Sequence, residues 1–430
     1  MAKKVGVAIL GLGVVGGGTY ETLVNHRDFY LKTQGVDISV ELVLDKALDR
    51  LMQLGVPQEK IAKSIDDIVN NPNIQIVIET IGGIGVAKSF VTSALSAGKT
   101  VVTSNKEMIC KYSHELEKIA KKNRCGLYYE ASCVGGVPII RTLLDGVQAN
   151  HIQSMMGIVN GTTNYILTKM AYEGADYAEV LKEAQKLGYA EANPTADVDG
   201  YDSMYKLSIL SSMAFHTKIP YTKIFREGIS AVDGKDIAYG KELGYTLKLL
   251  AIGKNTDKGV EVRVHPTFIP NSHPLASVND SFNAVYMVGD AVGDVMLYGR
   301  GAGALPTASA VVSDVIYAAT HAEIKYSTFK NNATADRGVK FISDFESAYY
   351  LRLSVDDKAG VLAKIAGVFA KCGISIVEIA QKLKGNETVP DRVPLVIITH
   401  KTMENTVKSA VAKIKALGIG TVEAVIRVEQ

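Results

Sequence analysis

The feature that most constrains the fold is a glycine-rich turn near the start of the chain. Residues 5–10, VGVAIL, form an apolar run suited to a buried parallel strand, and GLGVVGGGTYETLV follows at once. Gly11, Gly13 and Gly16 fit G-x-G-x-x-G, and the helical pattern begins directly after them. Glycines in a G-x-G-x-x-G pattern allow a tight turn, close approach to a pyrophosphate and close helix–strand packing. The N–H groups at the helix N-terminus favour phosphate. The context predicts a dinucleotide site formed by Gly11, Leu12, Gly13, Val14, Val15 and Gly16.

The next expected strand, VDISVELVLD, ends at Asp45. An acid at this place usually bonds the ribose 2′-OH and favours NAD over NADP. Asp45 lies 29 residues after Gly16, more than the usual ~20, so we expect an extended first helix or loop that contains Arg27 and Lys32. The spacing leaves open that Asp45 is a solvated strand end. The predicted cofactor is therefore NAD or NADP, with NAD favoured.

Further strand–helix units follow in the first third of the chain. Expected strands are IQIVIET (74–80), TVVTSNKE (100–107) and GLYYEAS, and the helical patterns VAKSFVTSALSAG and LEKIAKKNRCG lie between them. This alternation predicts an α/β fold with a Rossmann-type, doubly wound parallel sheet, which binds ligands at the carboxyl ends of its strands. Lys106 could alternatively be a surface lysine. The residues expected to face the cofactor are Thr80, Ser104, Asn105, Lys106 and Glu130.

The loop EASCVGGVP (130–138) allows three interpretations. It could be a phosphate-type glycine loop, a cation loop built on carbonyl groups, or a loop with a reactive cysteine. A nucleophilic Cys133 needs a base such as histidine, and neither His114 nor His151 stands in a suggestive setting. The other cysteines show no C-x-x-C spacing and are expected to be reduced thiols.

The stretch GYAEANPTADVDGYDSMYK (188–206) places a lysine among acidic residues. The segment from Asp199 onward is expected to be helical, so Asp202 and Lys206, four residues apart, share one face. The simplest interpretation is a surface ion pair, worth about 0.3–0.5 kcal/mol. The helix is mostly apolar beyond Lys206, however, so we expect it to be buried, and a buried lysine needs partners.

A buried lysine among carboxylates suits the chemistry of a carbonyl reductase. Lysine can protonate the oxygen that forms when hydride adds to a carbonyl group. The carboxylates would bind a substrate ammonium group and keep the lysine charged until it acts. The stretch therefore predicts hydride-transfer chemistry on a small amino-acid aldehyde or alcohol.

Several segments together resemble the homoserine dehydrogenase family, and the resemblance covers nearly the whole chain. It implies NAD(P)-dependent interconversion of aspartate 4-semialdehyde and homoserine in threonine and methionine biosynthesis. The segments are GLGVVGGG, TSNKE, EASCVGGVPI, NGTTNYILTKM, the stretch 188–206 and VGDAVGDVMLYGRGAGALPTASAVVSD.

The resemblance also implies roles for single residues. Lys206 would be the proton donor, and Lys106 would reach the cofactor or substrate. The substrate amino group would be bound by Glu191 and Asp202, supported by Asp197.

The same resemblance implies a monovalent cation, usually sodium, and further cofactor contacts. Leu44 stands where the family often has an arginine, which favours NAD, and Cys133 stands where valine is more frequent. The cation would be held by Glu130 and the carbonyl groups of Cys133, Gly135 and Val137, and Gly188 and Gly303 would lie against the cofactor.

The expected domains follow from pattern and resemblance. Residues 1–137, completed by 306–320, form the nucleotide domain; 138–305 form an α+β substrate domain whose sheet pairs across a dimer; 322–348 form a linker. Residues 349–430 show a βαββαβ pattern, a ferredoxin-like plait, and VDDKAGVLAKIAGVFAKCGISI resembles an ACT domain, with Ala359 in place of the usual proline. Feedback inhibition by threonine is implied, although a role in dimerisation alone stays open.

Composition excludes several classes of protein. With 47 basic and 45 acidic residues, the net charge is +2, which argues against a nucleic-acid partner. The chain has no run of ~18 apolar residues for a membrane span, and its start lacks a signal-peptide cleavage site. We expect a cytoplasmic homodimer or homotetramer with a small-molecule substrate. Two alternatives remain: a thiol-dependent semialdehyde dehydrogenase that uses Cys133, and a non-catalytic nucleotide-sensing regulator.

Overall fold

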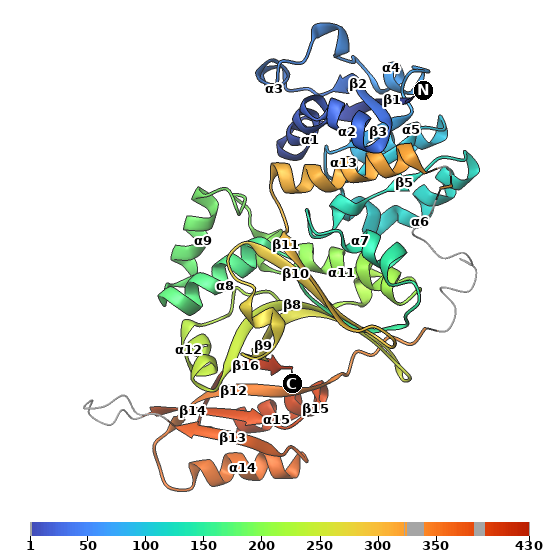
Figure 1. Cartoon of the computed structure of the whole chain (residues 1–430). Coiled ribbons are helices and arrows are strands. Elements are labelled where there is room, and N and C mark those ends of the chain that lie inside the picture. The colour runs from blue at the N-terminus through green and yellow to red at the C-terminus, as the bar shows by residue number, and fades with distance from the viewer. Residues whose placement is uncertain (1, 322, 325–338, 382–391, 430) are drawn as a thin grey trace.

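The computed structural model describes residues 2–321, 323–324, 339–381 and 392–429. Two sheets organise them, a five-stranded sheet near the N-terminus and an eleven-stranded sheet that runs through the middle and C-terminal parts. Figure 1 shows the N-terminal part at one end of the molecule and the C-terminal part at the other. Within the described ranges, none of the helices combines the length and apolar character needed to cross a bilayer.

The N-terminal sheet is parallel throughout and has the strand order β2-β1-β3-β4-β5. The strands are β1 (Lys3–Leu10), β2 (Val36–Leu44), β3 (Ile76–Glu79), β4 (Thr100–Thr103) and β5 (Leu127–Tyr128). The helices are α1 (Val14–Asn25), α2 (Arg27–Gln34), α3 (Leu48–Gln53), α4 (Ile65–Val69), α5 (Val86–Ser96) and α6 (Lys106–Lys122), with a 3-10 turn, η1 (Gln58–Lys60). The predicted Rossmann-type fold is confirmed.

The chain reverses its winding direction beside β1, because β2 lies on one side of that strand and β3 on the other. Ligands of such sheets bind in the crevice outside the carboxyl ends of the strands at this point. The longer spacing before Asp45 has a structural cause: a second helix, α2, follows α1 and ends at Gly35, whose φ is +69°. Arg27 and Lys32 lie in this second helix, where an extension of the first helix or its loop was expected.

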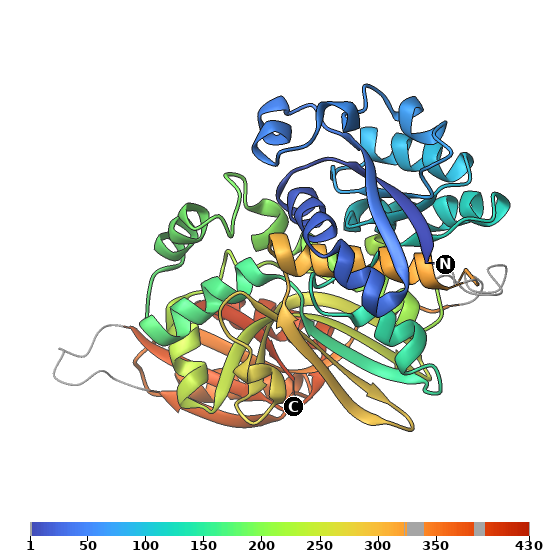
Figure 2. The same cartoon turned by 45° about the horizontal axis from the view of Figure 1, so that its top comes forward.

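Helix α13 (Ala304–Thr320) returns to the N-terminal sheet from far along the chain and packs on α1. Val311 and Val315 are fully buried in the same apolar cluster as Val7 and Ile9 of β1. Figure 2 shows α13 lying beside α1 and across the N-terminal part. One face of the sheet is therefore completed by residues almost 300 positions after β1.

Two predicted strands run into the helix or turn that follows them. The strand predicted over 100–107 ends at Thr103, because Asn105 caps α6 by accepting a hydrogen bond from the Met108 N–H group at 3.1 Å. Lys106 is thus the first residue of a helix. In GLYYEAS only Leu127 and Tyr128 are in a strand, and the 3-10 turn η2 (Glu130–Ser132) follows.

The middle part places helices on an antiparallel sheet in the order β11-β10-β6-β8-β9. Its strands are β6 (Ile152–Ile158), β7 (Phe225–Arg226), β8 (Tyr245–Thr256), β9 (Gly259–Pro270), β10 (Phe282–Gly289) and β11 (Gly293–Arg300). Its helices and turns are α7 (Ile139–Arg141), η3 (Thr142–Gly146), α8 (Gly161–Glu173), α9 (Tyr177–Lys186), α10 (Thr195–Val198), α11 (Tyr201–Ala214), η4 (Tyr221–Lys223), α12 (Gly234–Glu242) and η5 (Pro274–Ser277).

The C-terminal part has the predicted βαββαβ order and the sheet order β16-β12-β14-β13. Strand β16 also lies parallel to β9, through Arg427 opposite Thr267 and Val428 opposite Phe268, so the C-terminal sheet continues the middle one. The elements are β12 (Glu346–Asp356), α14 (Val361–Lys371), β13 (Ile376–Gln381), β14 (Arg392–Thr399), β15 (Thr402–Met403), α15 (Glu404–Ala416) and β16 (Gly420–Val428).

The expected linker, 322–348, falls partly on residues 322 and 325–338, which lie outside the described ranges. Its last three residues belong to β12, which begins at Glu346. Before that, Phe341 forms a bridge with Val260 of β9. The described end of this segment is therefore tied to the middle sheet.

Candidate active site

The glycine turn lies at the reversal point of the N-terminal sheet. Gly11 has a φ of +87°, and a Cβ atom on Gly16 would lie 1.9 Å from the Gly11 carbonyl oxygen, so neither position accepts a side chain. The Thr80 hydroxyl group, at the end of β3, donates to the same oxygen at 2.8 Å. Gly13 has open space around it. The turn is thus packed tightly at Gly11 and Gly16. The space around Gly13, at the N-terminus of α1, is open.

Asp45 bonds the glycine turn instead of standing free at the strand end. One carboxylate oxygen accepts from the Leu12 N–H group, and the other accepts from the Ala47 N–H group at 2.8 Å. Arg50 lies beside it and donates from Nε to the Leu12 carbonyl oxygen at 3.1 Å. Both an acid and a guanidinium group therefore lie next to the place where the cofactor ribose is expected.

A buried acid that the sequence analysis did not single out shapes the next loop. Glu79 is fully buried and accepts from the N–H groups of Ile81 and Gly82 and from the Thr103 hydroxyl group. Burial raises the pKa of Glu79 despite these hydrogen bonds. Asn105 donates to the Gly83 carbonyl oxygen at 2.6 Å, and Ser104 donates its N–H group to the Glu79 carbonyl oxygen. The ends of β3 and β4 are thereby fixed to each other.

Two lysines from distant parts of the chain share one carboxylate. Gly200, with a φ of +80°, caps the N-terminus of α11, and Asp202 and Lys206 lie on the first two turns of that helix. The Lys206 Nζ atom lies 2.7 Å from Asp202 Oδ2 and donates to the Val159 carbonyl oxygen at 2.7 Å. The Lys106 Nζ atom, at the start of α6, lies 2.9 Å from Asp202 Oδ1.

The lysine pair differs in exposure. Lys206 is 8% exposed as a residue, as predicted for a buried helix, whereas the Lys106 side chain is 43% exposed. Burial alone would raise the pKa of Asp202, but the Lys106 and Lys206 ammonium groups hold it well below its usual value. The Asp202 charge in turn raises the pKa of Lys106. Asp202 therefore stays ionised between the two lysine side chains.

Asn160 completes the cluster and was not predicted as a site residue. Its amide Nδ2 donates to Asp197 Oδ1 at 2.7 Å and to Asp202 Oδ2 at 2.9 Å. Its Oδ1 caps α8 by accepting from the Thr163 N–H group. Burial and the Asp202 charge raise the pKa of Asp197, and the hydrogen bond from Asn160 opposes that shift. The signal in the sequence was the Asn-Gly-Thr-Thr helix start.

Three predicted residues lie at the margin of this cluster. Glu191 is exposed, and its backbone carbonyl oxygen accepts from the Gln185 amide at 3.0 Å; among the described residues, its carboxylate forms no ion pair with either lysine. Gly188, with a φ of +77°, follows α9, and Gly303, with a φ of +116°, caps α13. Both glycines occupy exposed turns.

The loop after β5 is buried and tightly bonded. The two carboxylate oxygens of Glu130 accept from the N–H groups of Ile140 and Arg141 at 2.8 and 2.6 Å. Burial and the neighbouring Asp314 raise the pKa of Glu130 to about 7. A Cβ atom on Gly135, whose φ is +51°, would lie 2.3 Å from the Gly301 carbonyl oxygen.

These residues fit a small cation in their donor chemistry, since carboxylate and carbonyl oxygens are the ligands that hard cations prefer. The Val137 carbonyl oxygen accepts a hydrogen bond from the Ile139 N–H group. No backbone N–H group of the described residues donates to the carbonyl oxygens of Cys133 and Gly135. The described ranges contain no cluster of three or more His, Cys, Asp or Glu side chains that could hold a metal ion. A cation here would therefore rely on backbone oxygen atoms.

Cys133 lacks the properties of a nucleophile. Its side chain is fully buried, and burial raises the pKa of the thiol to about 12. A reactive cysteine needs a lowered pKa and access to the substrate. The structure therefore disfavours the thiol mechanism.

The chain has close relatives over almost its full length. A homoserine dehydrogenase of Bacillus subtilis is 41% identical over 406 residues, which cover 94% of this chain and 93% of that protein. A homoserine dehydrogenase of Neisseria gonorrhoeae is 40% identical, and 96% of each chain is covered. The chain belongs to the homoserine dehydrogenase family.

Family models and solved structures agree with this assignment. Residues 138–316 match the homoserine dehydrogenase model, 11–130 match the homoserine dehydrogenase NAD-binding domain and 349–419 match the ACT domain. The crystal structure of a homoserine dehydrogenase from Thiobacillus denitrificans is 38% identical with a TM-score of 0.92, and covers 100% of this chain and 99% of that one. A hyperthermophilic archaeal homoserine dehydrogenase in complex with NADPH is 28% identical, with a TM-score of 0.63 over 73% of this chain and 97% of that chain.

The predicted resemblance is thus confirmed, as are the C-terminal ACT domain and the class of enzyme. As a homoserine dehydrogenase family member, the chain is an oxidoreductase with a domain for a nicotinamide cofactor. The Asp202 cluster and the glycine turn lie within the two matched catalytic regions.

Proposed function

We propose that the chain catalyses the reversible reduction of L-aspartate 4-semialdehyde to L-homoserine, with Lys206 as the proton donor. The observation that carries this proposal is the position of the Lys206 ammonium group. An ammonium group has three N–H donors, and two of them are engaged by Asp202 and the Val159 carbonyl oxygen. The third is available for a carbonyl oxygen of the substrate.

In the reducing direction, the nicotinamide cofactor supplies hydride to the aldehyde carbon when bound. Lys206 donates a proton to the carbonyl oxygen as negative charge develops there, and in the reverse direction the neutral amine takes that proton back. Asp202 holds the Lys206 side chain in position through their 2.7 Å contact. Lys106 uses one donor on Asp202, so its other two can reach the substrate or the cofactor.

The substrate ammonium group needs a carboxylate that is still free to accept. Both Asp202 oxygens are already engaged, by Lys106 on one side and by Lys206 and Asn160 on the other. We therefore infer that Asp202 chiefly positions the lysines. Asp197, which has an oxygen beyond the one bonded to Asn160, and the exposed Glu191 are proposed to bind the substrate ammonium group.

For the cofactor, we propose NAD as the preferred form. Asp45 accepts from the Leu12 N–H group beside the proposed ribose site, where its charge would repel a 2′-phosphate, and Leu44 offers no positive charge. Arg50 is a nearby cation, and its charge would favour the 2′-phosphate of NADP and so reduce the preference for NAD. Contacts are proposed from residues 11–16, Thr80, Ser104, Asn105, Lys106, Gly188 and Gly303.

We also propose a bound sodium ion in the loop after β5. Glu130 and the carbonyl groups of Cys133, Gly135 and Val137 would hold it, and the ion would organise the loop that packs on Gly301. The raised pKa of Glu130 supports this, because a buried carboxylate beside Asp314 gains from a positive neighbour.

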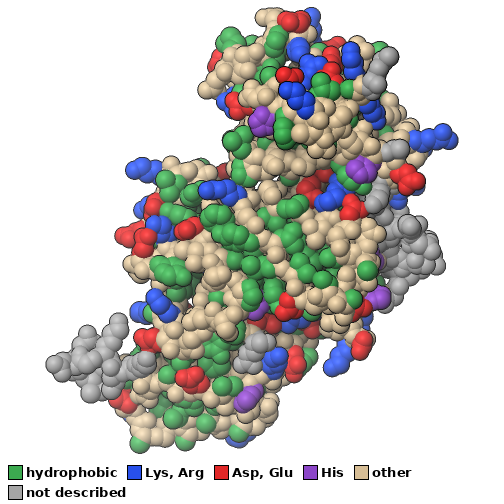
Figure 3. Space-filling view, viewed as in Figure 1, with side chains coloured by type: hydrophobic (Ala, Val, Ile, Leu, Met, Phe, Trp, Pro, Cys, Tyr) green, Lys and Arg blue, Asp and Glu red, His purple; other side chains and the backbone are tan. Residues whose placement is uncertain are grey.

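Regulation and assembly are proposed from the C-terminal part and the sheet edges. Threonine is the proposed effector of the ACT domain. A homodimer or homotetramer is supported by β11, an edge strand on which Met296 and Tyr298 are 39% and 53% exposed. Figure 3 shows hydrophobic side chains gathered on this face of the molecule, over β10 and β11. The proposed domains are 1–137 with 306–320, 138–305 and 349–430.

The direct test is oxidation of NADH and of NADPH with aspartate semialdehyde, with and without threonine. The Cys133→Ala variant distinguishes the proposed mechanism from a thiol-dependent semialdehyde dehydrogenase. Full activity in that variant excludes a cysteine nucleophile, whereas lost turnover with intact folding would support one. A nucleotide-sensing regulator would bind the cofactor but show no semialdehyde-dependent oxidation.

A further inference from the structure

A cavity of about 340 Å³ lies where the C-terminal part meets the middle sheet. β16 pairs with β9 over only Arg427 and Val428, and the two strands diverge before that point. Most of the wall is formed by residues 227, 228, 230–232, 236, 266 and 423–427, and Asp199 lies at one end. The volume is in the range of sites for small organic molecules.

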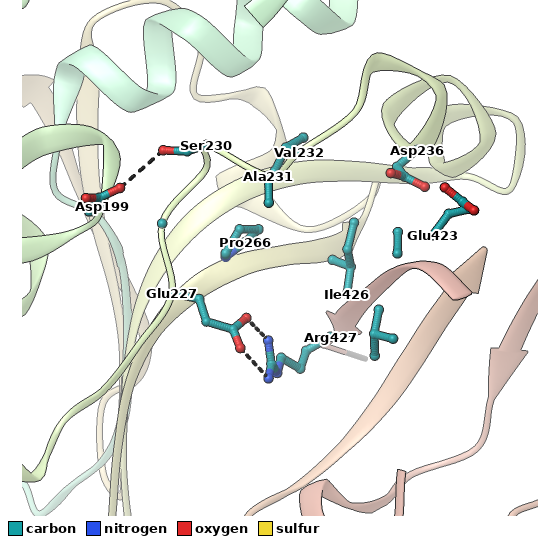
Figure 4. A pocket seen from close by; sticks show the side chains of 13 residues that line it. Asp199, Glu227, Ser230, Ala231, Val232, Asp236, Pro266, Glu423, Ile426 and Arg427 are labelled. Atoms are coloured by element: carbon teal, nitrogen blue, oxygen red, sulfur yellow. Dashed lines mark hydrogen bonds and ion pairs between the residues drawn. The ribbon is translucent and has the colours of Figure 1, made fainter. Parts of the chain in front are cut away.

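Carboxylates stand at both ends of this cavity. Figure 4 shows Asp199 beside Ser230 at one end, and Asp236 with Glu423 at the other. The side chains of Ala231, Pro266 and Ile426 lie between the ends. The cavity thus has an apolar middle and two acidic ends.

Two of the lining carboxylates are compensated by arginines. Asp236 accepts from Arg352 at 2.6 and 3.0 Å, and Glu227 forms an ion pair with Arg427.

Among the described residues, the carboxylates of the other two accept a hydrogen bond from a hydroxyl group. Asp199 accepts from Ser230 at 3.2 Å, and Glu423 accepts from Thr421. In the part of the chain that the structure describes, neither carboxylate forms an ion pair with a lysine or arginine. Each end of the cavity therefore holds one carboxylate that is not paired with a basic side chain, while the Arg226 guanidinium group bonds the Asp199 backbone carbonyl oxygen and Arg352 bonds only Asp236 at the other end.

We propose that this cavity binds a small aliphatic molecule that carries primary ammonium groups and a net positive charge, and that its occupancy changes turnover at Lys206. An ammonium group satisfies a carboxylate by charge and by hydrogen bonds, and a short alkyl chain suits the apolar middle. Because each end is acidic, a ligand with two ammonium groups should bind more tightly than one with a single group. A ligand that carries only carboxylates should be repelled.

The cavity wall is packed directly on the segment that begins the lysine helix. A Cβ atom on Gly228 would lie 2.3 Å from the Val198 carbonyl oxygen, and the Ile229 N–H group donates to the same oxygen at 2.8 Å. Gly200, which caps the N-terminus of α11, is the residue after Asp199, and Asp202 follows two positions later. Movement of the wall on binding would therefore reach Asp202, the partner of both lysines. This coupling rests on the function proposed above.

Binding is tested by isothermal titration calorimetry of the full chain with putrescine, L-lysine, L-norleucine and glutarate. L-norleucine matches L-lysine in length but lacks the side-chain ammonium group. We expect L-lysine, putrescine or both to bind at one site per chain, at least tenfold more tightly than L-norleucine, and glutarate not to bind. Tighter binding of L-lysine indicates an amino-acid ligand, and tighter binding of putrescine indicates a diamine. Absence of binding by both, or equal binding of L-norleucine, overturns the proposal.

Three variants test whether the ligand binds in this cavity. Ala231→Leu fills its middle and should abolish binding, and Glu423→Gln removes one end charge and should weaken it at least tenfold. Glu378→Gln removes an exposed glutamate from β13, at the far edge of the sheet, and should change nothing. Glu423 is exposed, so its variant should fold normally. Binding that is unchanged in both cavity variants lies elsewhere and overturns the proposal.

The kinetic arm measures semialdehyde reduction with saturating ligand. We expect kcat or KM of the wild-type chain to change at least twofold, and no change in Ala231→Leu, whose turnover without ligand should be normal. Tight binding without any kinetic change refutes the coupling. A wild-type chain that binds the amine but does not reduce the semialdehyde would reject the proposed reaction and leave the cavity site standing.

Discussion

Replacement of Lys206 by methionine is the sharpest test of the mechanism. Methionine keeps most of the apolar stem and removes the ammonium group. General acid catalysis is worth about 10²–10⁴-fold, so the barrier should rise by about 3–5 kcal/mol, at 1.36 kcal/mol for each factor of ten. Cofactor binding should not change, because the glycine turn does not contact Lys206.

The cost to folding can be derived from the contacts of the same side chain. Asp202 keeps Lys106 and Asn160 as partners, so no buried carboxylate is left alone. The Val159 carbonyl oxygen loses its donor, which costs about 1–3 kcal/mol. The variant should therefore fold, with a modestly lower free energy of unfolding.

The assay combines single-turnover and steady-state reduction of the semialdehyde with a fluorescence titration of the cofactor and urea unfolding. Lys106→Met is the matched control, because Lys106 shares Asp202 but is more exposed. We expect kcat of Lys206→Met to fall much further than kcat of Lys106→Met. If Lys206→Met folds, binds the cofactor and keeps kcat within tenfold of wild type, Lys206 is not the proton donor. A larger loss in Lys106→Met would assign that role to Lys106.

Three further outcomes are expected. Gly16→Ala should weaken cofactor binding at least a hundredfold in a fluorescence titration, because its Cβ atom would overlap the Gly11 carbonyl oxygen; normal affinity would contradict the tight turn. Asp45→Asn should raise the affinity for NADPH relative to NADH, and an unchanged ratio would show that Asp45 does not set the preference. Burial lowers the pKa of Lys248 to about 8, so between pH 8 and the unfolded value of about 10.4 the unfolded chain binds more protons and stability should rise with pH, by at most about 3 kcal/mol. In Lys248→Met, urea unfolding should show this part of the rise removed.

Much of the fold could be predicted because its signals are local. Strand β1 is apolar and is followed by glycines, so its place in a parallel sheet is visible in fourteen residues. The first helices, the C-terminal βαββαβ order and the buried character of α11 follow from the same kind of periodicity. The predicted strands over 100–107 and 126–132 were too long, because the hydrogen bonds of Asn105 and the turn at Glu130 end them.

The sequence by itself determined the parts of the site that lie on one element. Asp202 and Lys206 share a helical face because they are four residues apart. Gly11 and Gly16 stand at the two positions where the tight turn has no room for a side chain. Such relations depend on bond geometry over a few residues, which the order of residues already contains.

Only the tertiary structure decided which distant groups meet. Lys106 reaches Asp202 because α6 and α11 pack together, Asn160 joins Asp197 to Asp202, and Glu191 stays exposed. The same holds for β16 beside β9, whereas the return of residues 306–320 to the N-terminal domain was expected through the family resemblance alone. These contacts arise when separate apolar faces are buried against each other, and no spacing along the chain encodes which faces will be paired.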